Sequence, residues 1–246
     1  MIGAYGEWLL GYPARALASI DDAVVLAERP AHPVSLGIAL LNAAIIYHLR
    51  REPEEALRHA RRAEALAAEH RLASFISPGI LQGGALAAQG QAAEALAQFR
   101  AADKQGSVTV IALKPYALAL LSMTQAQVGD HRAALETITE ALAASEGSGA
   151  RWWEAEIHRL KGLVLLSHHD REASEACFVH SKKIAQRQNA RSLELRASTS
   201  LARLWCEQGK HTEAHDLLAP VYGWFTEGFD TLDLNEAKAL LEQLRA

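Results

Sequence analysis

The sequence predicts an all-α protein, an α-solenoid of about six helix hairpins followed by a C-terminal capping helix. The first observation is composition: 48 alanines and 35 leucines stand among 246 residues, against 16 glycines and 7 prolines. Ala and Leu favour the helix most strongly, and Gly and Pro disfavour it. The second observation is a period of 39–40 residues between short turns. Together they indicate stacked helix pairs and exclude an intrinsically disordered chain.

Six turns define the period, and small residues recur at fixed distances from them. The turns are at Gly11, Arg51, Gly90, Gly129, His169 and Gly209. Small residues stand five positions after each turn, at Ala16, Ala56, Ala95, Ala134, Ser174 and Ala214. Others stand seven before, at Ala4, Ala44, Gly83, Ser122, Gly162 and Ala202. Small side chains let the two helices of a hairpin cross closely. A single hairpin cannot bury its apolar face, so neighbouring hairpins must stack.

The period divides a single domain, 1–246, into successive units. The expected repeats are 1–32, 33–71, 72–110, 111–150, 151–190 and 191–230, with a capping helix at 233–246. Pro13 and Pro53 lie two residues past their turns, at the first helical position, where the missing N–H costs nothing. Pro33 and Pro115 similarly open the first helices of the second and fourth units.

The two ends of the chain differ. In the last helix we expect Asp233 to be the N-cap, with Glu236 three residues later. At the other end Tyr5, Trp8 and Leu9 lie close to an abrupt start, before a short first helix. An unfinished apolar end predicts that the chain is a fragment of, or was split from, a longer protein.

Charge and hydropathy narrow the class of protein. The net charge of -4 argues against a nucleic-acid binder, which needs a basic face. We see no apolar run of about 18 residues and no secretory signal, so we expect no membrane partner and a cytoplasmic location. Cys177 and Cys206 are expected to be reduced thiols.

The histidines and cysteines that could form a metal or catalytic site are better explained by ordinary structural roles. His211 and His215 have the spacing of two metal ligands on one helix, but no third ligand is evident. Cys177 and His180 lack a third group that would make a nucleophile and base. We therefore predict no catalytic, cofactor or metal site, and no enzyme activity in this chain.

The phases of the small residues resemble those of the tetratricopeptide repeat, whose usual length is 34 residues. The resemblance implies a right-handed superhelical α-solenoid of tetratricopeptide-like hairpins. It also implies that the first helix of each unit lines a concave groove that binds a protein or peptide.

Several C-terminal segments are similar to one narrower group. They are Trp153–Gly162, Ser192–Ala197, Ser200–Trp205 and Leu217–Asp230. This group is the MalT-like repeat region of bacterial multidomain proteins that carry an adenylate/guanylate cyclase module or a predicted AAA-type ATPase. The chain has no G-x-x-x-x-G-K-[ST] loop, so it lacks the nucleotide-binding motif of such an ATPase. The resemblance implies the repeat arm of a signalling protein, with its own missing catalytic domains as possible partners.

The groove positions implied by the repeat include six candidate partner contacts. They are His48, Tyr116, Glu156, Arg159, Arg196 and Arg203. Because Arg holds carboxylates bidentately, this set suits a peptide with an acidic portion. An arginine such as Arg196 could instead pair with Glu156 or Glu194 of the same chain.

Two other functions stay open from the sequence. One is a small-molecule-sensing regulatory repeat domain, which needs a closed pocket with convergent polar groups. The other is a fragment of an adenylate/guanylate cyclase whose catalytic domains are missing from this chain.

Overall fold

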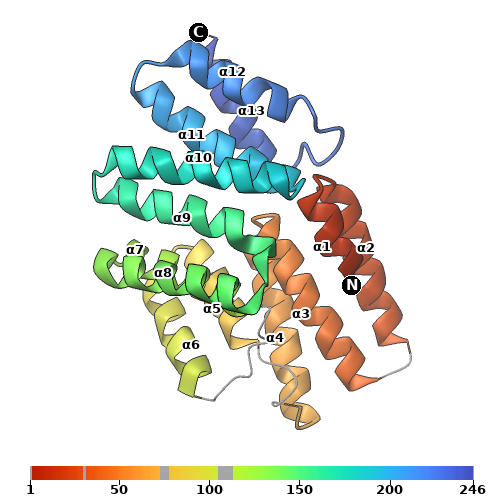
Figure 1. Cartoon of the computed structure of the whole chain (residues 1–246). Helices are drawn as coiled ribbons and strands as arrows, with labels where there is room; N and C mark the ends of the chain where they lie inside the picture. Colours follow the sequence, from red (N-terminus) through yellow and green to blue (C-terminus); the bar gives the residue numbers. More distant parts are fainter. Residues whose placement is uncertain (1, 30–31, 73–77, 105–112, 246) are drawn as a thin grey trace.

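The computed structural model describes residues 2–29, 32–72, 78–104 and 113–245, and within these ranges all regular elements are helices (Figure 1). Their bounds are α1 Ile2–Leu9, α2 Pro13–Glu28, α3 Pro33–Leu49, α4 Pro53–Glu69, α5 Gly79–Ala88, α6 Ala92–Lys104, α7 Lys114–Gln127, α8 His131–Ser148, η2 Arg151–Trp153 (a 3-10 turn), α9 Glu154–Ser167, α10 Arg171–Arg187, α11 Arg191–Glu207, α12 His211–Tyr222 and α13 Leu232–Leu244. Helices α1 to α12 form six hairpins, as the period predicts.

The six predicted turn residues all adopt the left-handed backbone conformation. Their φ angles are 94° at Gly11, 64° at Arg51, 80° at Gly90, 83° at Gly129, 62° at His169 and 78° at Gly209. A left-handed residue ends one helix and redirects the chain into the next. Glycine adopts this conformation freely, whereas Arg51 and His169 adopt it against their intrinsic preference. The sequence period therefore marks a repeated backbone feature.

The twelve small residues are all buried where the helices of a hairpin cross. A Cβ atom on Gly162 would lie 2.5 Å from Cε1 of Phe178, so this crossing requires glycine. Two serines among the twelve also satisfy carbonyl groups across the hairpin. Ser122 donates to the carbonyl of Ala134 at 2.7 Å, and Ser174 donates to the carbonyl of Gly162 at 2.8 Å. The boundary expected at 110–111 lies outside the described residues.

The first helices of the hairpins form a closed ring. Contacts join α1 to α3, α3 to α5, α5 to α7, α7 to α9 and α9 to α11, and α11 returns to α1. Figure 1 shows the first hairpin beside the ends of α10 and α11. In the first five hairpins the second helix packs against its partner and against the first helix of the next hairpin. The final helix α13 packs on α11 and α12, as expected of a capping helix.

The start of α13 differs from the prediction. The helix begins at Leu232 with Thr231 as N-cap, so Asp233 is not the cap but lies in the first turn. Its carboxylate is instead 2.8 Å from Nε of Arg196. The Asp233 carboxylate is thus engaged by Arg196, which is nearly buried, and not by the backbone N–H groups that a helix cap would bind. None of the described helices is long and apolar enough to span a membrane.

Candidate ligand cavity inside the helical ring

The ring surrounds a cavity of about 640 Å³. Its walls come from the inner helices α3, α5, α7, α9 and α11, with α13 and the turn after α3 completing them. Five of the six sequence-predicted residues line it: His48, Glu156, Arg159, Arg196 and Arg203. The structure thus brings residues from three different repeats to one cavity, and Tyr116 is the exception.

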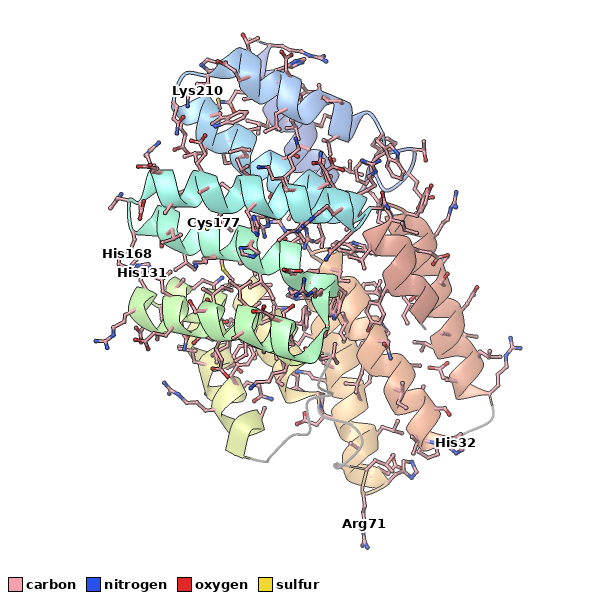
Figure 2. The ribbon with its side chains drawn as sticks, viewed as in Figure 1. His32, Arg71, His131, His168, Cys177 and Lys210 are labelled. Carbon is pink, nitrogen blue, oxygen red and sulfur yellow. The ribbon has the colours of Figure 1, made fainter. Side chains whose placement is uncertain are left out.

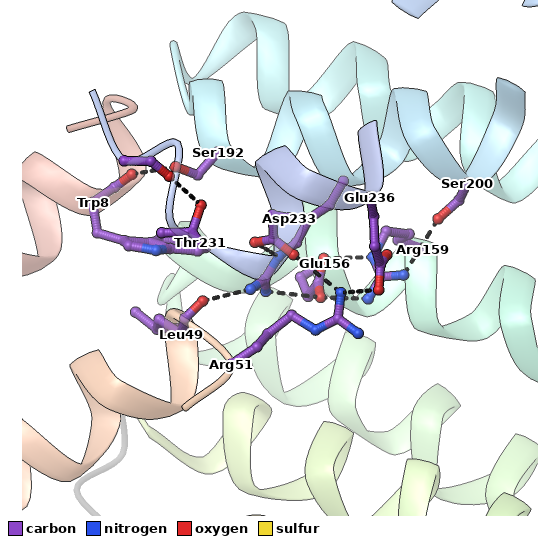
Figure 3. A network of polar contacts seen from close by, with 12 residues as sticks. Trp8, Leu49, Arg51, Glu156, Arg159, Ser192, Ser200, Thr231, Asp233 and Glu236 are labelled. Atoms are coloured by element: carbon purple, nitrogen blue, oxygen red, sulfur yellow. Dashed lines mark hydrogen bonds and ion pairs between the residues drawn. The ribbon is translucent and has the colours of Figure 1, made fainter. Parts of the chain in front are cut away.

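Glu156 is the centre of the polar network on one wall (Figure 3). Arg159 donates from Nε to one of its carboxylate oxygens at 2.8 Å and from Nη2 to the other at 2.7 Å. Arg196 donates to the same carboxylate at 3.3 Å. Burial alone would raise the pKa of Glu156, but these two arginines outweigh it and lower the pKa to about 2. Glu156 is only 3% exposed, so its carboxylate is a fixed part of the wall.

Arg196 connects the last repeat with the first two. Its Nη2 donates to the carbonyl of Leu49, and its guanidinium lies 4.8 Å from the ring centre of Trp8. Burial by itself would lower the pKa of Arg196, yet Asp233 and Glu156 together raise it. The sequence left open whether Arg196 pairs with Glu156 or Glu194, and the structure shows the pair with Glu156.

At the mouth of the cavity, one carboxylate lies between two arginines. Glu236 of α13 is 2.9 Å from Arg51 and 3.5 Å from Arg203. The two arginine side chains are 40% and 51% exposed, so they remain accessible to solvent. Sequence reasoning missed Arg51 and Glu236, because groove positions were sought only on first helices. The sequence feature that could have revealed this contact is the series of acidic residues just before and at the start of the last helix.

His48 lies between the polar wall and an aromatic cluster. Its ring meets that of Tyr116 edge-on, with the two ring centres 5.7 Å apart. Burial, reinforced by the positive charge of Arg196, lowers the pKa of His48 to about 4. His48 is therefore neutral near pH 7 and adds no charge to the cavity.

Tyr116 belongs to the packed core, which corrects the expectation of an accessible groove residue. It is 1% exposed and packs against Trp152 and Trp153, with ring centres 5.8 Å and 5.5 Å away. Burial raises the pKa of Tyr116 well above its ordinary value. The reason is local: the 3-10 turn that starts the fifth repeat places two tryptophans over this ring. Tyr116 therefore supports the cavity wall from behind.

Histidines are paired elsewhere in the molecule. His131 and His168 lie side by side at one end of α8 and α9, with ring centres 4.7 Å apart (Figure 2). His158 and His180 form a second such pair at 4.5 Å. Within the described residues, no group of three or more His, Cys, Asp or Glu side chains is arranged to hold a metal ion.

No family model matches the chain. An uncharacterized protein of Rhizobium meliloti (strain 1021) is 24% identical over 204 residues. The match covers 82% of this chain but 20% of that relative, so the chain spans about a fifth of the relative's length.

Solved structures of similar fold are helical repeat proteins. A Rap protein complexed with Competence and Sporulation Factor superposes with a TM-score of 0.69 and 16% identity, over 96% of this chain and 70% of its own. BtubC from P. vanneervenii has a TM-score of 0.56 and 16% identity, over 95% of this chain and 89% of its own. The chain is thus a tetratricopeptide-like α-solenoid. The finer link to cyclase and ATPase proteins stays a prediction.

Proposed function

We propose that the chain is a non-catalytic scaffold that binds a protein or peptide ligand on the inner face of its helical ring. The observation that supports this most directly is the cavity. Five candidate residues from three repeats converge on it, and Arg203 keeps half of its side chain exposed at the mouth. An arginine in that position can bind a carboxylate bidentately. The ligand class is accordingly a polypeptide with an acidic portion.

In the cell, we place this scaffold in the cytoplasm as the repeat arm of a bacterial signalling protein, with cyclase or ATPase domains as its neighbours. The C-terminal sequence resemblance supports that context. The Rap protein of similar fold was solved in complex with Competence and Sporulation Factor, so a solenoid of this kind can hold a bound factor.

A second candidate function is the sensing of a small molecule. The volume of about 640 Å³ falls within the range of roughly 300–1,000 Å³ that small-molecule sites occupy. Four arginines and three carboxylates line the cavity, so such a ligand would be polar.

Binding to charge-reversed variants tests the proposal. Partners captured on the whole chain are identified, purified and titrated against the wild type, Arg203→Glu and Arg132→Glu. Arg132 is the matched control, because its side chain is 89% exposed on α8, and it is not among the residues that line the cavity. We expect Arg203→Glu to weaken partner binding at least about ten-fold and Arg132→Glu to leave it unchanged. Equal affinity of all three proteins would contradict the proposal. Thermal stabilisation by a polar metabolite, with no protein partner found, would favour the second candidate.

A further inference from the structure

The segment 224–236, which we call the C-terminal strap, carries a carboxylate at every third position. These are Glu227, Asp230, Asp233 and Glu236. The first two lie in the connection between α12 and α13, and the other two lie in the first turns of α13. All four carboxylates face arginines that belong to other parts of the ring.

The first two carboxylates of the strap bind the first two repeats. Glu227 accepts hydrogen bonds at 3.0 Å from the backbone N–H groups of Ala14 and Arg15, and its carboxylate is 3.3 Å from the Arg15 guanidinium. Asp230 lies 2.8 Å from Nη2 of Arg50. These contacts join residues about 180 to 213 positions apart in the chain.

The other two carboxylates bind at the mouth of the cavity. Asp233 lies 2.8 Å from Arg196 and 3.4 Å from Arg51. Glu236 lies between Arg51 and Arg203, as described above. Figure 3 shows both carboxylates directed toward the arginines of this wall. The strap thus places its carboxylates beside the arginines at the cavity mouth, the same positions that the carboxylates of an acidic ligand would take.

The backbone of the strap fits closely against the first repeat. Gly228 has a φ of 75°, and a Cβ atom there would lie 2.2 Å from Cγ of Pro13. The ring of Trp224 lies 5.6 Å from that of Tyr12, and a Cβ atom on Gly11 would lie 2.5 Å from Trp224. The surface of the first repeat is therefore shaped for a non-helical segment with a glycine at this point.

Each outer ion pair of the strap has at least one solvent-exposed member. Arg50 is only 2% exposed but its partner Asp230 is 70% exposed, and the arginines of the other pairs are 60% exposed at Arg15, 40% at Arg51 and 51% at Arg203. Such pairs contribute little individually and weaken further in salt. Asp233 differs, because it is 13% exposed and pairs with Arg196, which is 9% exposed. The outer carboxylates are held by contacts that another acidic segment could replace.

We propose that Arg15, Arg50, Arg51 and Arg203 form a docking surface for an acidic segment of a protein partner, and that the C-terminal strap occupies this surface in cis until the partner's carboxylates replace its own. Charge complementarity supports this choice of occupant, since all four positions on the surface already bind carboxylates. The inference rests on the proposed function and names the partner chemistry: a segment with carboxylates at every third residue.

The test uses the whole chain and a synthetic peptide with the sequence of residues 224–236, capped at both ends and fluorescently labelled. The variant Glu227→Gln/Asp230→Asn/Glu236→Gln neutralises the outer carboxylates and keeps Asp233. We expect this variant to bind the peptide at least ten-fold more tightly than the wild type, by fluorescence anisotropy. A control peptide with amides at the four acidic positions should lose at least ten-fold in affinity. Adding Arg15→Glu and Arg51→Glu to the variant should abolish binding.

Hydrogen exchange at two amides reports on the strap itself. The N–H groups of Ala14 and Arg15 both donate to Glu227, so they should exchange faster in the neutralised variant and become protected again when the peptide binds. Equal peptide affinity for wild type and variant, or for acidic and amide peptides, would overturn the inference. So would a folded variant that keeps these amides protected and binds no peptide. A purified partner that still binds in an Arg203-dependent manner would leave the proposed function standing in each of those cases.

Discussion

The crossing of two helices within a hairpin and the junction between the first and last repeats are built from different side chains. At the crossings, small residues such as Gly162 let large apolar ones such as Phe178 fill the space. At the junction, arginines meet carboxylates and backbone carbonyls, as Arg50 does with Asp230 and Pro13. The difference shows that periodic small and apolar residues build the repeats, whereas the junction adds ion pairs and hydrogen bonds of arginines to its aromatic contacts.

The largest loss of stability should come from removing a large buried side chain at the point where the two helices of a hairpin cross. Phe178 is 0% exposed, and Phe178→Ala should destabilise the fold by about 3–5 kcal/mol, because it removes buried apolar area and leaves a cavity. Urea unfolding followed by circular dichroism measures the change. Val25→Ala is the control, since Val25 is 50% exposed and should cost less than about 0.5 kcal/mol. Similar losses for both variants would show that the crossings do not dominate stability.

A smaller but still large effect should come from the buried part of the junction. Arg196→Met leaves the carboxylate of Asp233 and the carbonyl of Leu49 without this partner, so we expect a loss of about 3 kcal/mol. The same unfolding measurement applies. In the control Arg171→Met, an ion pair with Glu207 between half-exposed side chains is removed, at a cost of about 0.5 kcal/mol. If Arg196→Met matched this control, the junction would be held mainly by its apolar contacts.

The smallest of the three effects should follow acidification. The folded protein holds the pKa of His48 at about 4, below its ordinary 6.5, so the unfolded chain takes up the proton first as pH falls. Stability should therefore fall through this window, by about 2 kcal/mol between pH 7 and pH 5 from His48.

The variant His48→Gln provides the matching control for this pH dependence. Its unfolding free energy should change less between pH 7 and pH 5 than that of the wild type. The contribution of Glu156 is present above its unfolded pKa near 4.5 and is lost as pH falls toward its folded pKa of about 2. Identical pH profiles for wild type and His48→Gln would contradict the assignment.

The local architecture could be predicted from the sequence. A turn with a left-handed residue and small residues at set distances from it are short-range requirements, and the chain repeats them six times. Prolines at helix starts follow from equally local rules. The convergence of Arg159, Arg196 and Arg203 on one wall was also predictable, because equivalent positions of successive repeats share a face.

Ring closure could not be predicted, because curvature accumulates from small rotations between repeats that the period does not specify. Without knowledge of ring closure, the local sequence predicts Asp233 to be a helix cap, although Asp233 pairs with Arg196 across the ring wall. Tyr116 is predicted to line the groove for a similar reason, since the two tryptophans that cover it belong to the next repeat.

The contact between α1 and α11 also changes how the molecule is expected to unfold. In an open array of repeats, each end unit has a single neighbour, so the array frays inward from its ends. Here the first hairpin is bonded to the last through Ser192, whose hydroxyl donates to the carbonyl of Trp8. Each terminal repeat thus gains the second neighbour that an open array denies it. We therefore expect the repeats to unfold cooperatively, without fraying that starts at the first or the last repeat.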